Sequence, residues 1–172
     1  MKISESWLRS WDNPDLSTKN LAHQMTMIGL EVNSIFEDGK DIEKIIIAKL
    51  ITVKEHPNAN KLKICNLSVN GKKQIKVVCG AANILCGKKY PLAVPGAILP
   101  NGIIIKKSKI RGVISNGMLC SESEIGLGDD ADGIMELPDD APTGKKLINY
   151  LELPDSIFDI DIMPNRGDCF SV

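Results

Sequence analysis

The chain has 172 residues, of which 43% are hydrophobic and 25% charged, as is usual for a globular protein of one or two domains. Its longest clearly apolar run, residues 45–48, is far shorter than the ~20 residues that cross a membrane. Residues 1–7 lack the apolar stretch of a secretion signal. We therefore expect a cytoplasmic protein, and we exclude membrane-spanning, collagen-like, low-complexity and disulfide-stabilised secreted proteins.

The charges are segregated along the chain. Residues 40–111 contain fifteen Lys/Arg and three acidic residues, a balance of +12, whereas residues 1–39 carry −3 and residues 113–172 carry −10. Such a basic block is typical of proteins that bind polyanions. It is also what a solvated, lysine-rich surface between acidic flanks would show, so charge alone leaves both interpretations open. Because Tyr90 is the only aromatic residue between positions 37 and 149, any RNA contact is expected to use phosphates, 2′-hydroxyls and shape rather than stacked bases.

The first forty residues predict two helices and a strand. Ser17 is a suitable N-cap for a helix over 18–28, and Gly29 is placed to end it. Apolar residues recur on one face of that helix (Leu21, Ala22, Met25 and Ile28). A short first helix is expected to pack Trp7, Leu8 and Trp11 on the same core, and a strand is expected at 31–36.

From residue 42 the pattern changes to strands, with one long, β-branched strand expected at 42–54 and others at 62–69, 74–79, 90–94, 103–111 and 117–121. Asn70-Gly71 is the strongest hairpin signal, and a shift of the apolar face within 62–69 predicts a bulge there. Short strands between turns, without a long helix, predict a small closed barrel of OB type. A short helix at 145–151 and a half-buried strand at 157–162 follow.

The sequence contains no phosphate-binding loop, dinucleotide-binding motif, metalloprotease motif or nucleophile elbow. Its five cysteines include no C-x-x-C pair, and its two histidines, His23 and His56, are far apart in the sequence. Asp159 and Asp161 are interpreted as solvent-facing residues of a strand. We therefore predict no catalytic residue, no metal ligand and no cofactor site in this segment.

Three strings resemble, in order, the tRNA-binding OB domain found in many tRNA-binding proteins: HPNANKL at 56–62, VCGAAN at 78–83 and KIRGVISNGM at 109–118. Asn60 stands where that family usually carries an acid. The flanks MKISESWL at 1–8 and MPNRGDC at 163–169 resemble the N-terminus of the β subunit of bacterial phenylalanyl-tRNA synthetase. In that family the OB domain is inserted into a small α+β domain.

The resemblance implies a mainly β fold, in which an OB-fold barrel at 40–149 is inserted into a small discontinuous α+β domain made of 1–39 and 150–172. The chain stops in a polar loop soon after residue 169, so we expect it to be truncated at its C-terminus. The parent enzyme of the family is an α₂β₂ assembly that uses ATP and Mg²⁺ to charge tRNA with phenylalanine. The resemblance therefore implies tRNA and the α subunit as partners, no membrane or DNA, and a non-catalytic, tRNA-binding role for this segment.

Nine residues are the candidate RNA contacts (Lys61, Asn83, Lys106, Lys107, Lys109, Arg111, Ser115, Asn116 and Met118). The best phosphate candidates among them are Lys106, Lys107, Lys109 and Arg111, and the Arg111 guanidinium can form two parallel hydrogen bonds with a phosphate or stack on a base. His56 is expected to be structural. Three alternatives stay open: a stand-alone tRNA-binding or chaperone-like protein on the same barrel, a subunit-docking module of the synthetase, and, most remotely, a hydrolase or metal enzyme.

Overall fold

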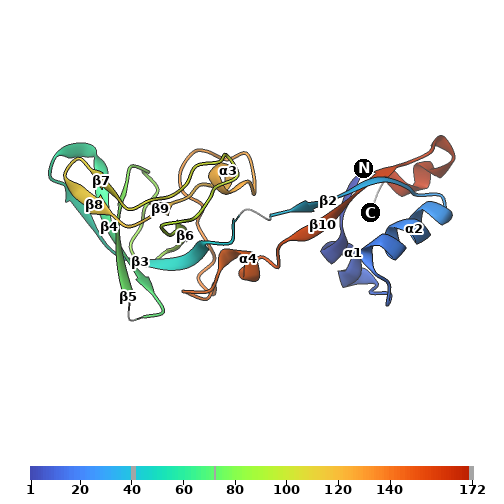
Figure 1. The fold of residues 1–172 in the computed structure, drawn as a ribbon, viewed down its shortest axis with the longest axis horizontal. Coiled ribbons are helices and arrows are strands. Elements are labelled where there is room, and N and C mark those ends of the chain that lie inside the picture. The colour runs from blue at the N-terminus through green and yellow to red at the C-terminus, as the bar shows by residue number, and fades with distance from the viewer. Residues whose placement is uncertain (40–41, 72, 171–172) are drawn as a thin grey trace. The chain divides into compact units, whose positions relative to one another are not determined.

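The computed structural model describes residues 1–39, 42–71 and 73–170. The chain forms two compact units, drawn in Figure 1. Unit 1 comprises Met1–Asp38 together with the residues from Leu153 onward, and unit 2 comprises Gly39–Glu152. The predicted boundary at residue 40 lies outside the described residues. Within the described ranges, no helix is long and apolar enough to cross a membrane.

Unit 1 is an antiparallel sheet with two helices. Its strand order is β1 (Lys2–Ser4), β10 (Asp155–Asp161) and β2 (Glu31–Asp38). The helices are α1 (Glu5–Trp11) and α2 (Thr18–Met27), and a 3₁₀ segment, η2 (Pro164–Phe170), follows β10. Phe158 and Ile160 of β10 pack with the buried face of α2, formed by Leu21, Ala22 and Met25.

The ends of α2 confirm the predicted capping residues. The Ser17 hydroxyl accepts the N–H of Asn20 at 3.3 Å, and Gly29 follows the C-cap residue Ile28 with a φ of 95°. This left-handed conformation, which glycine adopts without strain, ends the helix and leads the chain into β2.

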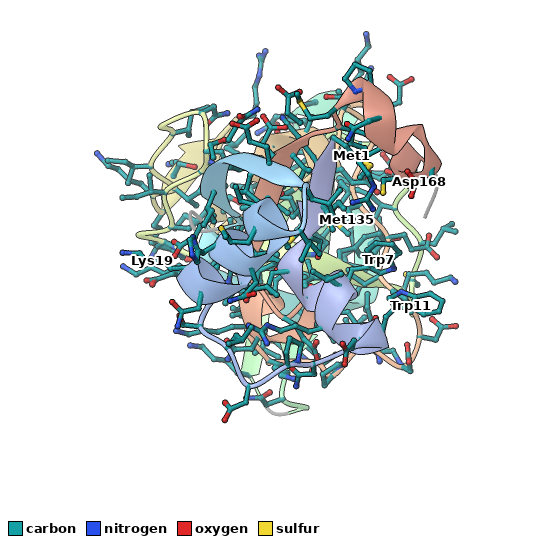
Figure 2. The ribbon with its side chains drawn as sticks, turned by 90° about the vertical axis from the view of Figure 1, so that its right-hand side faces the viewer. Met1, Trp7, Trp11, Lys19, Met135 and Asp168 are labelled. Atoms are coloured by element: carbon teal, nitrogen blue, oxygen red, sulfur yellow. The ribbon has the colours of Figure 1, made fainter. Side chains whose placement is uncertain are left out.

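The prediction that both tryptophans pack on the core is wrong. Trp7 is 40% and Trp11 77% exposed, and only Leu8 of the three predicted residues packs on the core of unit 1. Residues 7 and 11 are one helical turn apart, so they share a face of α1, and the neighbouring Leu8 points elsewhere. The two rings, labelled in Figure 2, make an edge-to-face contact with 6.2 Å between centroids.

Unit 2 contains a five-stranded antiparallel sheet and a separate hairpin. The sheet has the order β5 (Lys73–Cys79), β4 (Ala59–Val69), β3 (Ile45–His56), β6 (Lys89–Ala93) and β9 (Met118–Leu119). The hairpin consists of β7 (Ser108–Ile110) and β8 (Val113–Ser115). Two short helices, α3 (Glu122–Ile125) and α4 (Leu147–Tyr150), complete the unit. The described structure is thus mainly β, as predicted.

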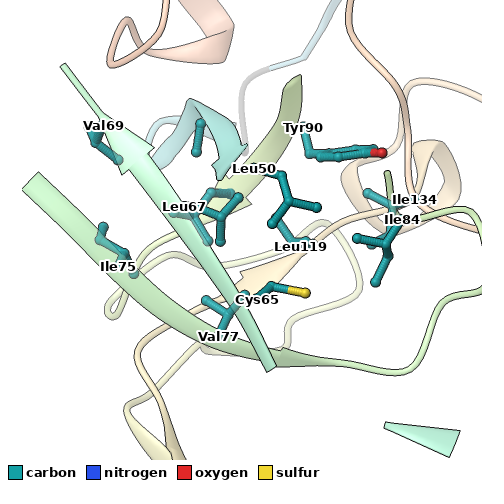
Figure 3. Packing of buried hydrophobic residues seen from close by; sticks show 12 residues of the cluster. Leu50, Cys65, Leu67, Val69, Ile75, Val77, Ile84, Tyr90, Leu119 and Ile134 are labelled. Carbon is teal, nitrogen blue, oxygen red and sulfur yellow. The ribbon is translucent and has the colours of Figure 1, made fainter. Parts of the chain in front are cut away.

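The core of unit 2 lies on one face of the sheet. Alternate residues of β4 (Cys65, Leu67 and Val69) are buried against Leu50, Ile75, Val77 and Leu119, which Figure 3 shows together. The predicted bulge is wrongly placed, because β4 keeps an unbroken register with β5. The irregularities lie in the β3–β4 pairing, between Leu50 and Thr52 and between Glu55 and His56.

Turn residues set where the strands end. Asn70 and Gly71, which lie between β4 and β5, have φ values of 55° and 70°, which confirms the predicted positive φ at both positions of this hairpin turn. The predicted strands at 103–111 and 117–121 are mostly irregular and retain only 108–110 and 118–119. Among the described residues no ladder joins β9 to β5, so a closed barrel is not identified.

Candidate nucleic-acid interface

The β7–β8 hairpin and the segment just before it carry four exposed cations, Lys106, Lys107, Lys109 and Arg111. Its turn is formed by Arg111 and Gly112, whose φ values are 48° and 99°. Two consecutive positive φ values define the type I′ turn that best fits the twist of a two-stranded hairpin. Glycine suits such a position, whereas an arginine there is uncommon. The turn therefore places Arg111 at the hairpin tip.

The HPN part of the first string holds that tip. His56 is only 4% exposed; its Nδ1 accepts the N–H of Asn58 at 3.1 Å. Because Nδ1 is the acceptor, the other ring nitrogen, Nε2, donates to the carbonyl of Ile110 at 3.1 Å. Asn58 Nδ2 donates to the carbonyl of Arg111, also at 3.1 Å. These tip contacts, made by His56 and Asn58, fix the hairpin beside the β3–β4 turn (Figure 1).

The third string fixes the base of the hairpin. Ser115 is 1% exposed; its hydroxyl accepts the N–H of Val78 at 3.0 Å and donates to the carbonyl of Gly117 at 2.8 Å. The backbone N–H of Asn116 donates to the carbonyl of Lys76 at 2.9 Å. Both ends of the hairpin are therefore hydrogen-bonded to the sheet.

Asn83 of the second string is bonded to another loop. Its Oδ1 accepts the N–H of Ile134 at 3.0 Å, and its Nδ2 donates to the carbonyl of the same residue at 2.8 Å. Gly133 lies so close that a Cβ there would be 2.7 Å from Asn83 Oδ1. The amide thus joins the loop after β5 to the segment after α3.

A cleft of about 860 Å³ lies between the hairpin and these loops. Its lining includes three of the nine candidate contacts, Asn83, Lys106 and Met118, together with two carboxylates, Glu124 and Asp132. The cleft therefore presents charges of both signs to a ligand.

Cys79 also lines the cleft, and burial raises the pKa of its thiol. Burial raises the pKa values of Cys65 and Cys120 to about 12. All three thiols are consequently protonated at neutral pH and are poor nucleophiles. Within the described ranges, no group of three His, Cys, Asp or Glu residues is arranged to hold a metal ion.

A second, smaller recess of about 490 Å³ lies at the hairpin tip. It is lined by the start of β4 and the tip residue (Asn58, Ala59, Asn60, Lys61, Leu62 and Arg111). Two candidate contacts far apart in sequence, Lys61 and Arg111, meet here. A Cβ on Gly80, which lines the cleft, would be 3.3 Å from Leu62 Cδ2. The recess and the cleft are therefore neighbours.

The cations of this region divide into two groups. Lys88 Nζ is 2.8 Å from a Glu136 carboxylate oxygen, and Lys89 Nζ donates to the carbonyls of Asp139 and Ala141 at 2.6 Å. These two lysines hold the acidic segment against the sheet. In contrast, five candidate cations are exposed and form no ion pair with any described carboxylate (Lys61, Lys106, Lys107, Lys109 and Arg111).

The structure thus separates the nine candidates by their contacts. Lys61 and Arg111 meet at the recess, Lys106 and Met118 at the cleft, and Lys107 and Lys109 lie on the hairpin segment outside both linings. Ser115, Asn116 and Asn83 bond to the chain itself. Sequence reasoning missed Asn58, although the Arg111-Gly112 pair in the third string indicates a turn that other residues must support.

Residues 45–146 match the family described as "Putative tRNA binding domain", and the chain belongs to this family. Over all 172 residues it is 48% identical to the phenylalanine–tRNA ligase β subunit of Acinetobacter baylyi and 49% identical to that of Legionella pneumophila strain Paris. The chain spans 22% of the length of each of these relatives. Among solved structures, it is similar to a MetRS-related protein from Pyrococcus horikoshii, with 22% identity and a TM-score of 0.45 over 60% of this chain and 87% of that one.

Proposed function

We propose that unit 2 binds tRNA without catalysis, through the sugar–phosphate backbone. The observation that carries this proposal is the group of five unpaired cations on and beside the hairpin, which two sets of hydrogen bonds hold in place. Phosphates supply most of the affinity in such contacts, and fixed cations lose little freedom on binding. Membership of the tRNA-binding domain family supports the same ligand.

We also propose that the sheet of unit 2 is an OB-type barrel. Its two edge strands, β5 and β9, contact each other although no ladder joins them. The hydrogen bond from the Asn116 N–H to the Lys76 carbonyl links the segment between β8 and β9 to β5. A sheet whose edges meet in this way is curled, as the strands of a small barrel are.

In a longer protein, we propose, this segment is the tRNA-binding and structural part of a phenylalanyl-tRNA synthetase β subunit in the cytoplasm. The similarity to β subunits over the whole chain supports this assignment. We propose that ATP and Mg²⁺ bind to other regions of such an enzyme. We also propose that the β subunit charges tRNA only in assembly with the α subunit. A tethered tRNA-binding module raises the local tRNA concentration near a catalytic site.

A salt titration of tRNA binding tests this function. If about three to five phosphates are contacted, log K should fall with log[salt] with a slope of roughly −2 to −4. Replacing Lys107, Lys109 and Arg111 together by Gln should weaken binding and reduce the magnitude of the slope by about 2 to 3. No binding, or binding without a salt slope, would contradict the proposal.

The matched control removes the same charge elsewhere in the basic block. Lys44, Lys49 and Lys73 are exposed and lie toward the end of the sheet opposite the β3–β4 turn. Their joint replacement by Gln should change the affinity much less than the hairpin triple variant. Equal losses in both triple variants would mean that general charge, and not the hairpin, attracts tRNA.

Docking to another subunit is the second candidate. Three isoleucines of the loop before β7 support it, because Ile98, Ile103 and Ile104 are 57%, 52% and 53% exposed. Pull-down with the α subunit tests it: replacing Ile98 and Ile103, which lie outside the cleft lining, by Ser should abolish capture without changing the affinity for tRNA.

A further inference from the structure

We propose that the recess at the hairpin tip is a seat for one RNA phosphate group, bound between Lys61 and Arg111. We propose further that His56 and Asn58 are positioning residues for Arg111. This inference rests on the proposed function, because it assumes that unit 2 binds tRNA, and it identifies where one backbone phosphate is held.

The charge of the recess favours an anion more clearly than that of the cleft. Its lining holds two cations, Lys61 and Arg111, and no carboxylate, whereas the cleft lining contains Lys106 together with Glu124 and Asp132. At contact distances, like charges repel about as strongly as opposite charges attract, so a phosphate gains more in the recess.

Asn60 contributes to this difference. It lines the recess and is exposed, and its side chain is uncharged. A carboxylate there would lie in the same recess as Lys61 and Arg111 and would compete with the phosphate for both cations. In this chain the two cations are left available.

The two cations have complementary chemistry. A guanidinium presents a planar fork that can donate two parallel hydrogen bonds to phosphate oxygens, while an ammonium acts as a mobile point charge. The guanidinium can orient a phosphate only if the backbone of Arg111 is held in place. A fixed Arg111 therefore sets the direction of the phosphate, and Lys61 adds charge from the start of β4.

His56 and Asn58 fix that backbone. They bond to the carbonyls of Ile110 and Arg111, which belong to the two peptide groups on either side of the Arg111 Cα. Asn58 Nδ2 also lies 3.4 Å from the position that a Cβ on Gly112 would take, so the amide packs on the turn itself. Asn58 carries no charge, so its replacement can change the salt slope only by moving a cation.

A double-mutant cycle tests the positioning role. Arg111→Gln should weaken tRNA binding by about tenfold and lower the magnitude of the salt slope by about 1. Asn58→Ala should weaken it about threefold and also lower the slope, although it removes no charge. The double variant should bind no more weakly than Arg111→Gln alone, because Asn58 acts through Arg111. Additive losses, or an unchanged slope in Asn58→Ala, would overturn the positioning role.

A separate variant tests the seat without touching any hydrogen bond of the tip. Asn60→Asp adds one negative charge to the recess at constant shape and should weaken tRNA binding by about five- to tenfold at low salt. Asn149→Asp is its matched control, since Asn149 is exposed on α4, which packs on β3. Equal losses of tRNA affinity in the two variants would contradict the proposed phosphate seat.

The outcomes distinguish this inference from the function on which it rests. If the unmodified protein binds no tRNA, the proposed function fails. If it binds tRNA with a salt slope and the hairpin triple variant is weakened, but Asn60→Asp behaves like Asn149→Asp, the function stands and only the phosphate seat fails.

Discussion

The side chains of Ser115 and Asn83 are bonded to backbone groups of their own chain, although both lie in strings shared with tRNA-binding domains. Ser115 joins β8 to Val78, and Asn83 joins two loops through Ile134. The cations of the same strings, Lys61, Lys109 and Arg111, are exposed. At the scale of single residues, the strings therefore combine side chains that build the hairpin with side chains that are free to meet a ligand.

Ser115→Ala should lower the stability of unit 2 by about 1–3 kcal/mol, because it leaves the buried N–H of Val78 without an acceptor. Circular dichroism during thermal unfolding measures this loss. At temperatures where the variant is folded, its affinity for tRNA should stay within about twofold of the parent. A large loss of affinity with unchanged stability would show instead that the hydroxyl contacts RNA.

Gly117 is required by a close approach of two backbone segments. A Cβ there would be 2.5 Å from the carbonyl oxygen of Ala93, which cannot move without breaking the β6–β9 pairing. Gly117→Ala should therefore destabilise unit 2 by about 2–4 kcal/mol, from overpacking and backbone strain together.

Gly87→Ala is the matched control for this substitution. Its φ is 91°, but no atom lies within 4 Å of the added Cβ. Gly87→Ala should lower the stability of unit 2 only by the strain of a left-handed alanine, about 1 kcal/mol. Urea unfolding followed by circular dichroism compares the two; equal losses would contradict the steric explanation.

At the scale of elements, the alternation of apolar residues predicted β4, β5 and β10 well, because each buries one face of a sheet, and the β-branched residues predicted β3. The same rule overestimated the strand at 103–111. Ile103 and Ile104 are β-branched and apolar, yet they are half exposed in a loop, since β propensity reflects packing partners that a sequence does not display. The bulge was misplaced for a related reason, because register belongs to a pair of strands and not to one of them.

Asp155 gives unit 1 a dependence on pH. Burial tends to raise the pKa of its carboxyl, but hydrogen bonds from Ser4 and Ser6 outweigh this and hold the pKa below its usual value of 3.8. Because the folded pKa is the lower one, these bonds stabilise the folded state above pH 3.8, and this contribution is lost as the pH falls through the folded pKa.

Asp155→Asn should therefore be less stable than the parent at neutral pH and should lose less stability on acidification. Tryptophan fluorescence reports unit 1 specifically, because both tryptophans of the chain lie in α1. Ser6→Ala, which removes one donor to the carboxylate, should give a smaller effect in the same direction. Parallel pH profiles for the parent and Asp155→Asn would contradict this assignment.

At the scale of the whole molecule, the sequence showed a basic block but not which of its cations are available. Lys88 and Lys89 belong to that block, yet they hold the segment around Glu136 and Asp139. Likewise, the strings predicted that Lys61 and Arg111 matter, but their meeting in one recess depends on the hydrogen bonds of His56 and Asn58. Such pairings follow from tertiary contacts, which one-dimensional patterns of charge do not contain.

The central claim is that tRNA binds at the hairpin. Amide chemical shifts of the ¹⁵N-labelled protein, followed by NMR during titration with tRNA, test it most directly because they report each residue separately. The account predicts that the largest changes fall on residues 58–62 and 106–112, and that those at 129–140, in the acidic segment, are small. Changes concentrated in the acidic segment or in unit 1, with the hairpin unaffected, would contradict it.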